Sequence, residues 1–200
     1  VRLLFPGLLL LASGALMASE DFTEGEILSS GCGGCHGHTG ASAAASMPSI
    51  AGFDRRYLAR VLLEFKDGVR YSTIMGRLMA GYTREQITLL ASYYADQVWA
   101  DPDFEPDSGK VEQGLRIHEA LCEQCHEDGG RYQDRDMPRV AGQGFDYLWI
   151  QLQLRRAGTE GMQQPNRMRE ALLSLSDSEL LALAHYLASR DGSGATGTRP

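Results

Sequence analysis

Four cysteines and two histidines fall into a five-residue pattern that occurs twice in the chain. Residues 32–36 read CGGCH and residues 122–126 read CEQCH, 90 positions further on. On a helical turn, side chains three positions apart project from one side. Two thiols at this spacing can reach the two vinyl groups along one edge of a porphyrin, and the next residue can bind its iron. The pattern is typical of heme c attachment. It predicts two covalent hemes, held by Cys32, Cys35, Cys122 and Cys125, with His36 and His126 as iron ligands.

Two other uses of paired thiols stay open from the motif alone. Two Cys-x-x-Cys pairs can hold a zinc ion, and one pair can serve as a redox dithiol. The two motifs contain all four cysteines of the chain, so no cysteine is left for a disulfide framework. Zinc sites of this kind are mostly intracellular, whereas covalent heme suits an exported protein. The compartment therefore bears on the choice.

The first 18 residues resemble a secretory signal. Arg2 precedes a short apolar run, and small residues follow as far as Ala18. A membrane-spanning helix needs about 20 apolar residues, and this run is shorter and contains Pro6, Gly7 and Gly14. We expect an exported, periplasmic protein that does not span the membrane once the signal is removed. An uncleaved membrane anchor is the alternative.

The composition limits the possible partners. The formal net charge is −7, with 43% hydrophobic and 22% charged residues and no basic run. This balance argues against binding to nucleic acid. It favours a protein partner that carries a basic patch.

The chain also contains an internal repeat. Residues 47–52 (MPSIAG) match residues 137–142 (MPRVAG) at the 90-residue offset of the cysteines. Further on, residues 90–93 (LASY) match residues 183–186 (LAHY) at an offset of 93. A three-residue insertion between Leu148 and Met168 accounts for the change. Such self-similarity indicates a duplicated domain.

The repeat and the composition suggest domain boundaries. The stretch 100–109 contains two prolines, several acids and a glycine, as an extended linker does. The end of the chain is polar and rich in glycine, which predicts disorder. The expected organisation is a signal peptide (1–18), a first domain (19–99), a linker (100–109), a second domain (110–190) and a disordered tail (191–200).

Each half is expected to be all-α, because no segment alternates convincingly as a strand. A first helix should run from Glu24 to about Cys35, with a copy over 113–125, and an apolar stripe predicts a helix around 58–65. The last helix of each half should begin at a capping box. Thr83 precedes Gln86 by three residues and Ser176 precedes Glu179 by three.

The second axial ligand of each iron decides the chemistry. An open position allows catalysis, such as a peroxidase-like activity, whereas His/Met ligation gives an electron carrier of high potential. Met75 and Met168 each lie eight residues before a capping residue, Thr83 or Ser176, so the repeat selects them as ligands. Met79 and Met162 have no counterpart in the other half.

The other repeated methionines have a different expected role. Met47 and Met137 match each other but directly precede a proline, and we expect them to pack. A Met-Pro turn can also offer a carbonyl to the second ring nitrogen of an iron-binding histidine. Pro48 and Pro138 are the candidates for this contact.

With these motifs, the chain resembles the two-domain, diheme class I cytochromes c of the cytochrome c4 type, over roughly residues 22–190. The first half is most similar to the cytochrome subunit of flavocytochrome c sulfide dehydrogenase, in residues 65–68 (FKDG) and 72–77 (STIMGR). This resemblance implies two tandem cytochrome c domains, with His36 and His126 as proximal ligands and Met75 and Met168 as distal ligands.

The resemblance also implies a partner. The chain would form a periplasmic heterodimer with a flavoprotein that carries FAD, oxidises sulfide and passes electrons to the hemes one at a time. By itself the chain would be no enzyme, and it would relay electrons heme to heme to a soluble acceptor. The alternative is a free-standing cytochrome c4-like carrier that serves a terminal oxidase.

Overall fold

The computed structural model describes residues 22–193. The predicted signal peptide (1–18) lies outside the described residues, as do residues 194–200 of the predicted tail. The described part of the chain contains helices and loops and no β-strand, so the all-α prediction is confirmed. No helix between residues 22 and 193 has the length and apolar character that a membrane crossing requires.

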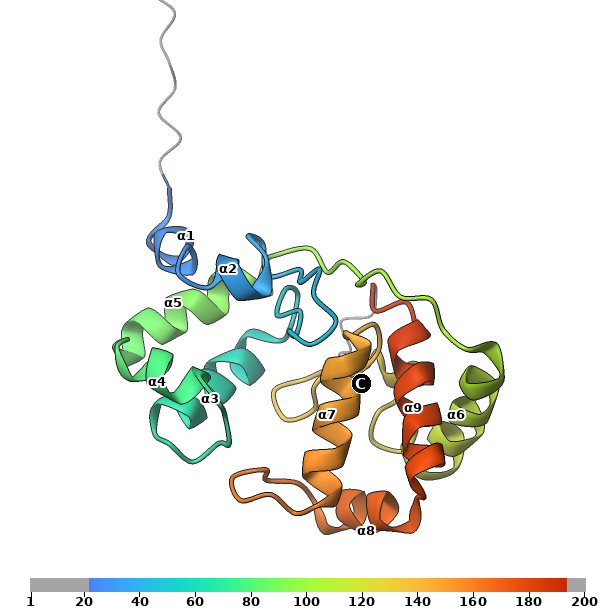
Figure 1. The fold of residues 1–200 in the computed structure, drawn as a ribbon. Helices are drawn as coiled ribbons and strands as arrows, with labels where there is room; N and C mark the ends of the chain where they lie inside the picture. Colours follow the sequence, from blue (N-terminus) through green and yellow to red (C-terminus); the bar gives the residue numbers. More distant parts are fainter. Residues whose placement is uncertain (1–21, 194–200) are drawn as a thin grey trace, which may run out of the picture.

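The helices form two groups that lie side by side, joined by an extended linker (Figure 1). In both groups the N-terminal helix packs on the last one, α1 on α5 and α6 on α9. The middle helices pack alike as well, with α3 on α4 and α5, and α7 on α8 and α9. The structure is thus two tandem helical domains of one plan. The first group consists of α1 (Glu24–Ser29), α2 (Gly33–His36), α3 (Arg55–Lys66), α4 (Met75–Ala80) and α5 (Arg84–Ala95). The second consists of α6 (Ser108–Leu121), the short 3₁₀ helix η1 (Asp128–Gly130), α7 (Phe145–Arg156), α8 (Asn166–Ser174) and α9 (Asp177–Ser189).

The start of the last helix in each domain is fixed by the predicted capping box. The hydroxyl of Thr83 accepts from the backbone N–H of Gln86, whose side-chain oxygen accepts from the N–H of Thr83 at 2.9 Å. Ser176 and Glu179 repeat the same exchange at α9. Each box satisfies two N–H groups that have no partner within the helix.

The single helix expected over residues 24–35 is wrong, because the chain leaves the helix before the motif. α1 ends at Ser29 and α2 begins at Gly33. The hydroxyls of Ser29 and Ser30 donate to the carbonyls of Glu26 and Ile27, both at 2.7 Å, and such bonds compete with the helical ladder. The copy expected over 113–125 behaves similarly, since α6 ends at Leu121. The first motif therefore lies on the separate short helix α2, with Cys32 at its N-cap, and the second motif follows the end of α6.

Glycines allow the first and last helices of each domain to approach closely. A Cβ atom added at Gly114 of α6 would lie 2.2 Å from the carbonyl oxygen of Ala182 and 2.6 Å from Cβ of Tyr186, both on α9. In the first domain, a Cβ atom at Gly25 of α1 would lie 3.0 Å from the carbonyl oxygen of Leu89 on α5. The crossing is tighter in the second domain, where only glycine fits.

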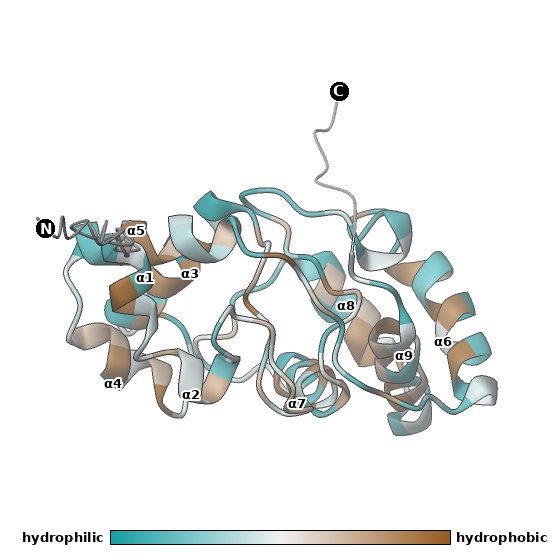
Figure 2. Cartoon of the chain, turned by 90° about the horizontal axis from the view of Figure 1, so that it is seen from above, coloured by the Kyte–Doolittle hydropathy of each residue, from teal (hydrophilic) through white to brown (hydrophobic). Residues whose placement is uncertain are grey.

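Each domain has its own apolar core. The helix α9 is mostly hydrophobic along its length, whereas α6 mixes hydrophilic and hydrophobic positions (Figure 2). The core of the first domain contains Phe53, Leu58, Leu90, Ala91, Tyr94 and Trp99. The core of the second contains Leu148, Leu152, Leu172, Leu175, Leu180, Leu183, Ala184, Tyr186, Leu187 and Ala188.

The beginning of the predicted tail differs from the expectation of disorder. Gly192 is buried, and its N–H donates to Oδ1 of Asp101 at 2.8 Å. The same oxygen accepts from the indole N–H of Trp99 at 2.8 Å. The chain at Gly192 thus packs against the start of the linker, because Asp101 accepts hydrogen bonds from both Gly192 and Trp99.

The crossing of α6 and α9 leads to a stability prediction. Gly114→Ala should lower the free energy of unfolding by about 1–3 kcal/mol, because the new methyl group forces the two helices apart. Gly109→Ala, in the first turn of α6, is the control. Its Cβ atom would meet only an oxygen of Asp107 at 3.4 Å, and alanine favours a helix by up to about 1 kcal/mol. Denaturant unfolding followed by circular dichroism measures both, and equal effects would contradict the proposed crossing.

Candidate functional site

His36 is buried at the end of α2, and its ring is held by a hydrogen bond. Nδ1 lies 2.9 Å from the carbonyl oxygen of Pro48 and donates its proton to it. The predicted contact between the Met-Pro turn and this histidine is confirmed. With the proton on Nδ1, the lone pair of Nε2 is available to a metal.

His126, the counterpart in the second domain, is held less tightly. Burial chiefly, and then the neighbouring His118 and Arg155, lower the pKa of His126 to about 4. The carbonyl of Pro138 acts in the opposite direction. Nδ1 of His126 is buried and makes no full hydrogen bond, unlike Nδ1 of His36, which bonds Pro48. The imidazole is therefore neutral at pH 7, which is the form that binds iron.

Burial disfavours the thiolate form of the first cysteine in each motif. Cys35 and Cys125 are exposed, whereas Cys32 and Cys122 are half-buried. Burial raises the pKa of Cys32, and it raises that of Cys122 to about 11 with help from the charges of Cys125 and Glu123. A redox dithiol requires the opposite shift.

The zinc alternative also lacks support. Among residues 22–193, no three His, Cys, Asp or Glu side chains group as a metal ion would need. Two buried histidines, each followed by a Met-Pro turn, and paired thiols beside them match the donor set of covalent heme instead.

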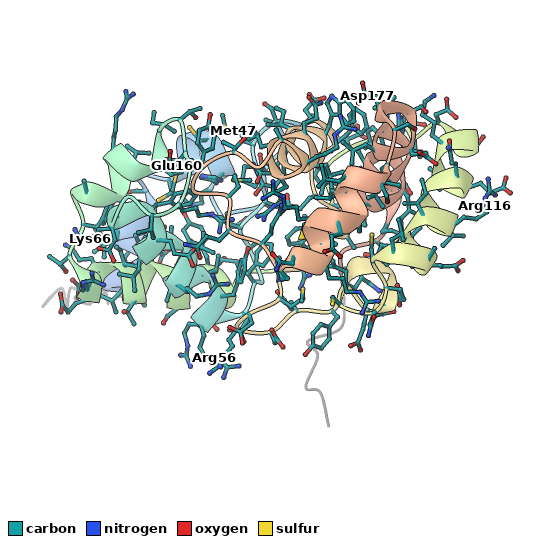
Figure 3. All side chains as sticks on the ribbon, turned by 90° about the horizontal axis from the view of Figure 1, so that it is seen from below. Met47, Arg56, Lys66, Arg116, Glu160 and Asp177 are labelled. Carbon is teal, nitrogen blue, oxygen red and sulfur yellow. The ribbon has the colours of Figure 1, made fainter. Side chains whose placement is uncertain are left out.

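The methionines differ in how they are packed. Met79 and Met162 are buried, 2% and 8% exposed, as gap-filling residues are. Met75 is the first residue of α4 and half-buried, and Met168 is half-buried in α8 against the second core. Met47, which was expected to pack, is 39% exposed because it ends a surface turn beside Pro48. Its label lies at the edge of the molecule in Figure 3.

Cations gather where the two domains meet. Glu64 pairs with Arg60 at 2.6 Å and with Arg70 at 3.1 Å. Arg155 of α7 donates to the main-chain carbonyl of Gln163, and burial and the charge of Arg70 lower its pKa. Arg155 also contributes to the lowered pKa of His126. The carboxylate of Glu64 thus pairs with two arginines, and Arg155 lies near Arg70. The net positive charge of this cluster would suit the two propionate groups of a heme.

A groove of about 860 Å³ lies between the domains beside these arginines. Its first wall is the segment from Phe65 to Arg77, which carries Tyr71, and its second wall is the loop 159–163. The loop reaches across to the first domain, where the N–H of Tyr71 donates to the carbonyl of Gly161 at 3.1 Å (Figures 1 and 3). The loop lies within the stretch of the predicted three-residue insertion, so the insertion extends the contact between the domains.

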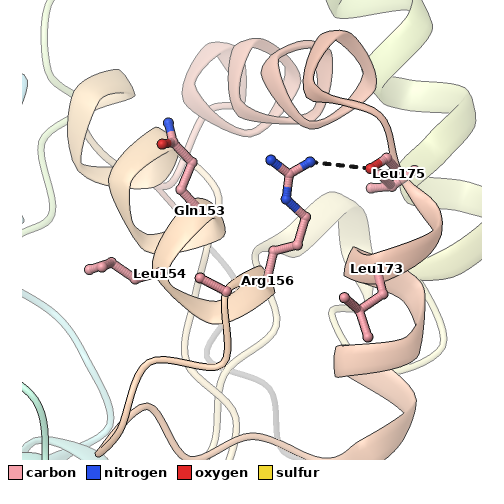
Figure 4. A pocket seen from close by; sticks show the side chains of 6 residues that line it. Gln153, Leu154, Arg156, Leu173 and Leu175 are labelled. Carbon is pink, nitrogen blue, oxygen red and sulfur yellow. Dashed lines mark hydrogen bonds between the residues drawn. The ribbon is translucent and has the colours of Figure 1, made fainter.

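A second hollow, of about 520 Å³, lies between α7 and α8 (Figure 4). Arg156 crosses it and donates to the carbonyl of Leu175 at 3.2 Å. No cysteine, histidine or methionine lines this hollow. We therefore regard it as a surface feature separate from the motifs.

Glutamines of the second domain hold the loop that follows Pro48. The side chain of Gln143 accepts from the N–H of Ser49 at 3.0 Å and donates to the carbonyl of the same residue at 2.7 Å. Gln133 makes an equivalent pair of bonds further along the loop, accepting from the N–H of Asp54 at 3.1 Å and donating to the carbonyl of Gly52 at 2.8 Å.

Arg139 also crosses the boundary and completes this contact. It donates to the carbonyl of Gly52 at 3.2 Å, and its guanidinium lies 4.6 Å from the ring centre of Trp99. Neither the motifs nor the helical patterns in the sequence pointed to these residues. Differences between the two halves of the repeat could have indicated them. At the 90-residue offset, Gln143 corresponds to Phe53 and Arg139 corresponds to Ser49.

His118 is a further difference between the domains. It is fully buried, and Nδ1 lies 3.0 Å from Oε2 of Glu123, which also accepts from the N–H of Gly129. Burial chiefly, and then the charge of Arg190, lower the pKa of His118 to about 4. His118 is thus packed inside the second domain. Leu28 occupies the equivalent position in the first domain.

Comparison with known proteins agrees with this arrangement. The chain is 31% identical to cytochrome c4 of Thiocapsa roseopersicina over 168 residues, which cover 78% of this chain and 85% of that protein. It is 46% identical over 99 residues to the cytochrome subunit of sulfide dehydrogenase of Chlorobaculum tepidum, covering 44% of this chain and 89% of that protein. No protein-family model matches the chain.

A solved structure shows the same fold. The crystal structure of reduced recombinant cytochrome c4 from Pseudomonas stutzeri superposes with a TM-score of 0.74 at 24% identity, covering 84% of this chain and 97% of that one. Two helical domains, each with its Cys-x-x-Cys-His motif, define a diheme c-type cytochrome, with two covalently bound hemes c, that carries electrons. The chain belongs to the cytochrome c4 family.

The charged cluster leads to a testable prediction. Glu64→Gln should lower the free energy of unfolding by about 1–3 kcal/mol, because two half-buried arginines lose their only charged acceptor in the pairs described. The control is Glu112→Gln, which breaks the exposed pair with Arg116 and should change stability by less than about 1 kcal/mol. Urea unfolding of the oxidised protein measures both. A loss in Glu64→Gln no larger than that of the control would show that the cluster is solvated.

Proposed function

We propose that the chain is a free-standing diheme electron carrier, which accepts electrons singly from a protein donor and delivers them to a protein acceptor such as a terminal oxidase. The observation that carries this proposal is the similarity to cytochrome c4 along most of both chains. A match of this extent favours a complete carrier over one half of a larger assembly. We further propose that the mature protein is exported to the periplasm and comprises the domains 19–99 and 110–190.

The proposed iron ligands are one histidine and one methionine in each domain. His36 and Met75 would bind the first iron, and His126 and Met168 the second. The cysteines Cys32, Cys35, Cys122 and Cys125 would form the thioether bonds. Support comes from the free Nε2 of His36 and from the half-buried positions of Met75 and Met168. Met79 and Met162, in contrast, are buried in packing contacts.

The chain's residues would then tune the electron transfer. Heme supplies a one-electron iron couple, whose potential depends on axial ligands, burial and hydrogen bonds to those ligands. Pro48 holds the proton on Nδ1 of His36, which makes the other nitrogen a stronger donor. Two filled axial positions would exclude small molecules from the iron, so the protein would carry electrons rather than react with a substrate.

Charge is distributed unequally over the two domains. Residues 22–99 contain 7 acidic and 7 basic side chains, whereas residues 100–193 contain 17 acidic and 10 basic ones. A partner with a basic patch would therefore approach the second domain preferentially, because electrostatic attraction steers the encounter.

The second candidate is the electron-accepting subunit of a flavoprotein sulfide dehydrogenase. The 46% identity over 99 residues to such a cytochrome subunit favours it, although this match covers only 44% of the chain. In this role the chain would form a heterodimer with an FAD-containing protein that oxidises sulfide. Both candidates use the same hemes and differ in the electron donor.

The ligand assignment predicts a spectroscopic result. Met75→Ala and Met168→Ala should each remove about half of the sulfur-to-iron charge-transfer band of the oxidised protein, because each deletes one Fe–S bond. Met79→Leu and Met162→Leu are the matched controls and should leave the band intact, since leucine fills a similar volume. Absorption spectra normalised to heme content measure the effect. A full band in either alanine variant would refute that ligand.

Purification from the native organism tests the function itself. A free-standing carrier should elute at the mass of one chain with two hemes and without flavin, because nothing in its role requires a tight partner. The measurement is size-exclusion chromatography with absorption and fluorescence assays for heme and FAD. Stoichiometric FAD in the same fraction would contradict the free-standing carrier and favour the sulfide dehydrogenase subunit.

A further inference from the structure

The acceptor for the His36 proton is held by the other domain. Pro48 receives the Nδ1 hydrogen bond at 2.9 Å, and the next residue, Ser49, exchanges two backbone hydrogen bonds with the side-chain amide of Gln143. Ser49 is 1% exposed and Gln143 is 3% exposed. Because water is excluded, no solvent molecule can replace these bonds at low cost. A residue of the second domain thus fixes the peptide that adjoins Pro48.

The second domain holds the histidine site of the first domain, but the first domain does not hold the site of the second in the same way. At the 90-residue offset, the counterpart of Gln143 is Phe53, which packs in the first core and has no amide. In the second domain, the residue after Pro138 is Arg139, whose side chain rather than its backbone reaches the first domain. The side-chain amide clamp therefore acts on the His36 site alone.

We propose that Gln143 is a positioning residue for the heme of the first domain, although it belongs to the second. By holding both backbone groups of Ser49, it fixes the carbonyl of Pro48 in line with Nδ1 of His36. A well-aligned acceptor raises the basicity of the ligating imidazole. A more basic ligand stabilises ferric iron and lowers the reduction potential of that heme. The contact between the domains thus sets the potential difference that drives the relay.

This inference rests on the ligation by His36 proposed above. It adds that the domain contact affects the reduction potential of the first heme. Within residues 22–193, no equivalent amide clamp acts on the second heme site. A change in the contact would therefore move one potential and leave the other in place. A purely structural glutamine would affect stability without separating the two hemes.

The test uses the full chain with both hemes and two variants. Gln143→Leu removes both hydrogen bonds at similar volume, and Gln143→Asn retains an amide that is one methylene too short to make both. The matched control is Gln133→Leu, which breaks an equivalent amide clamp between the domains at Gly52 and Asp54, away from Pro48. If Gln143→Leu does not accumulate with two hemes, Gln143→Asn provides the same measurement.

Spectroelectrochemical titration resolves the two reduction midpoints. We expect both Gln143 variants to raise one midpoint and leave the other unchanged, and Gln133→Leu to move neither to a similar extent. Proton exchange at Nδ1 of His36, followed by NMR of protein labelled in its histidines, should quicken in the same variants. Unchanged midpoints, or an equal shift in Gln133→Leu, would overturn the proposal.

Different variants test the ligation by His36 and the positioning role of Gln143, so either proposal can be refuted without the other. His36→Ala should remove the low-spin spectrum of one heme, and two intact low-spin hemes in that variant would refute the ligation. Unchanged midpoints in the Gln143 variants would refute only the positioning role.

Discussion

The structure depends on one requirement, that the histidine of a Cys-x-x-Cys-His motif bonds one ring nitrogen to the protein and leaves the other for a metal. In the first domain the carbonyl of Pro48 meets this requirement at 2.9 Å from Nδ1 of His36. The chain leaves α1 at Ser29 and forms the short helix α2 through His36, and the loop that follows brings the carbonyl of Pro48 to the ring of His36. The surrounding packing holds this geometry around the planar heme.

The repeat and its departures have separate structural meanings. Positions shared by both domains hold the heme or start a helix, as the motifs, the Met-Pro turns and the capping boxes do. Some of the positions that diverge lie where the domains meet or beside His126. Gln143 stands opposite Phe53, and His118 opposite Leu28. The same fold therefore provides two different environments, which allows two hemes in one chain to differ in potential.

Much of the secondary structure followed from local signals. The capping boxes at Thr83 and Ser176 depend on residues three positions apart, so sequence alone locates them. The helix expected through Cys35 failed because serine hydroxyls at residues 29 and 30 compete for carbonyls, a balance that periodicity does not report. The expectation that Met47 packs was wrong because a local turn leaves the side chain on the surface. The packing of Gly192 was missed because its partner Asp101 is 91 residues away in the chain.

The sequence by itself determined the cofactor, the duplication and the all-α class, because covalent attachment and helix capping depend on residues close together in the chain. It also named Pro48 and Pro138 as candidate partners of the motif histidines, and the structure confirms the contact of Pro48 with His36. Only the tertiary structure decided how the two sites communicate. Gln143 and Ser49 are 94 residues apart and meet because two domains pack face to face. An amide that binds backbone groups has no sequence signature, since every residue other than proline offers the same partners.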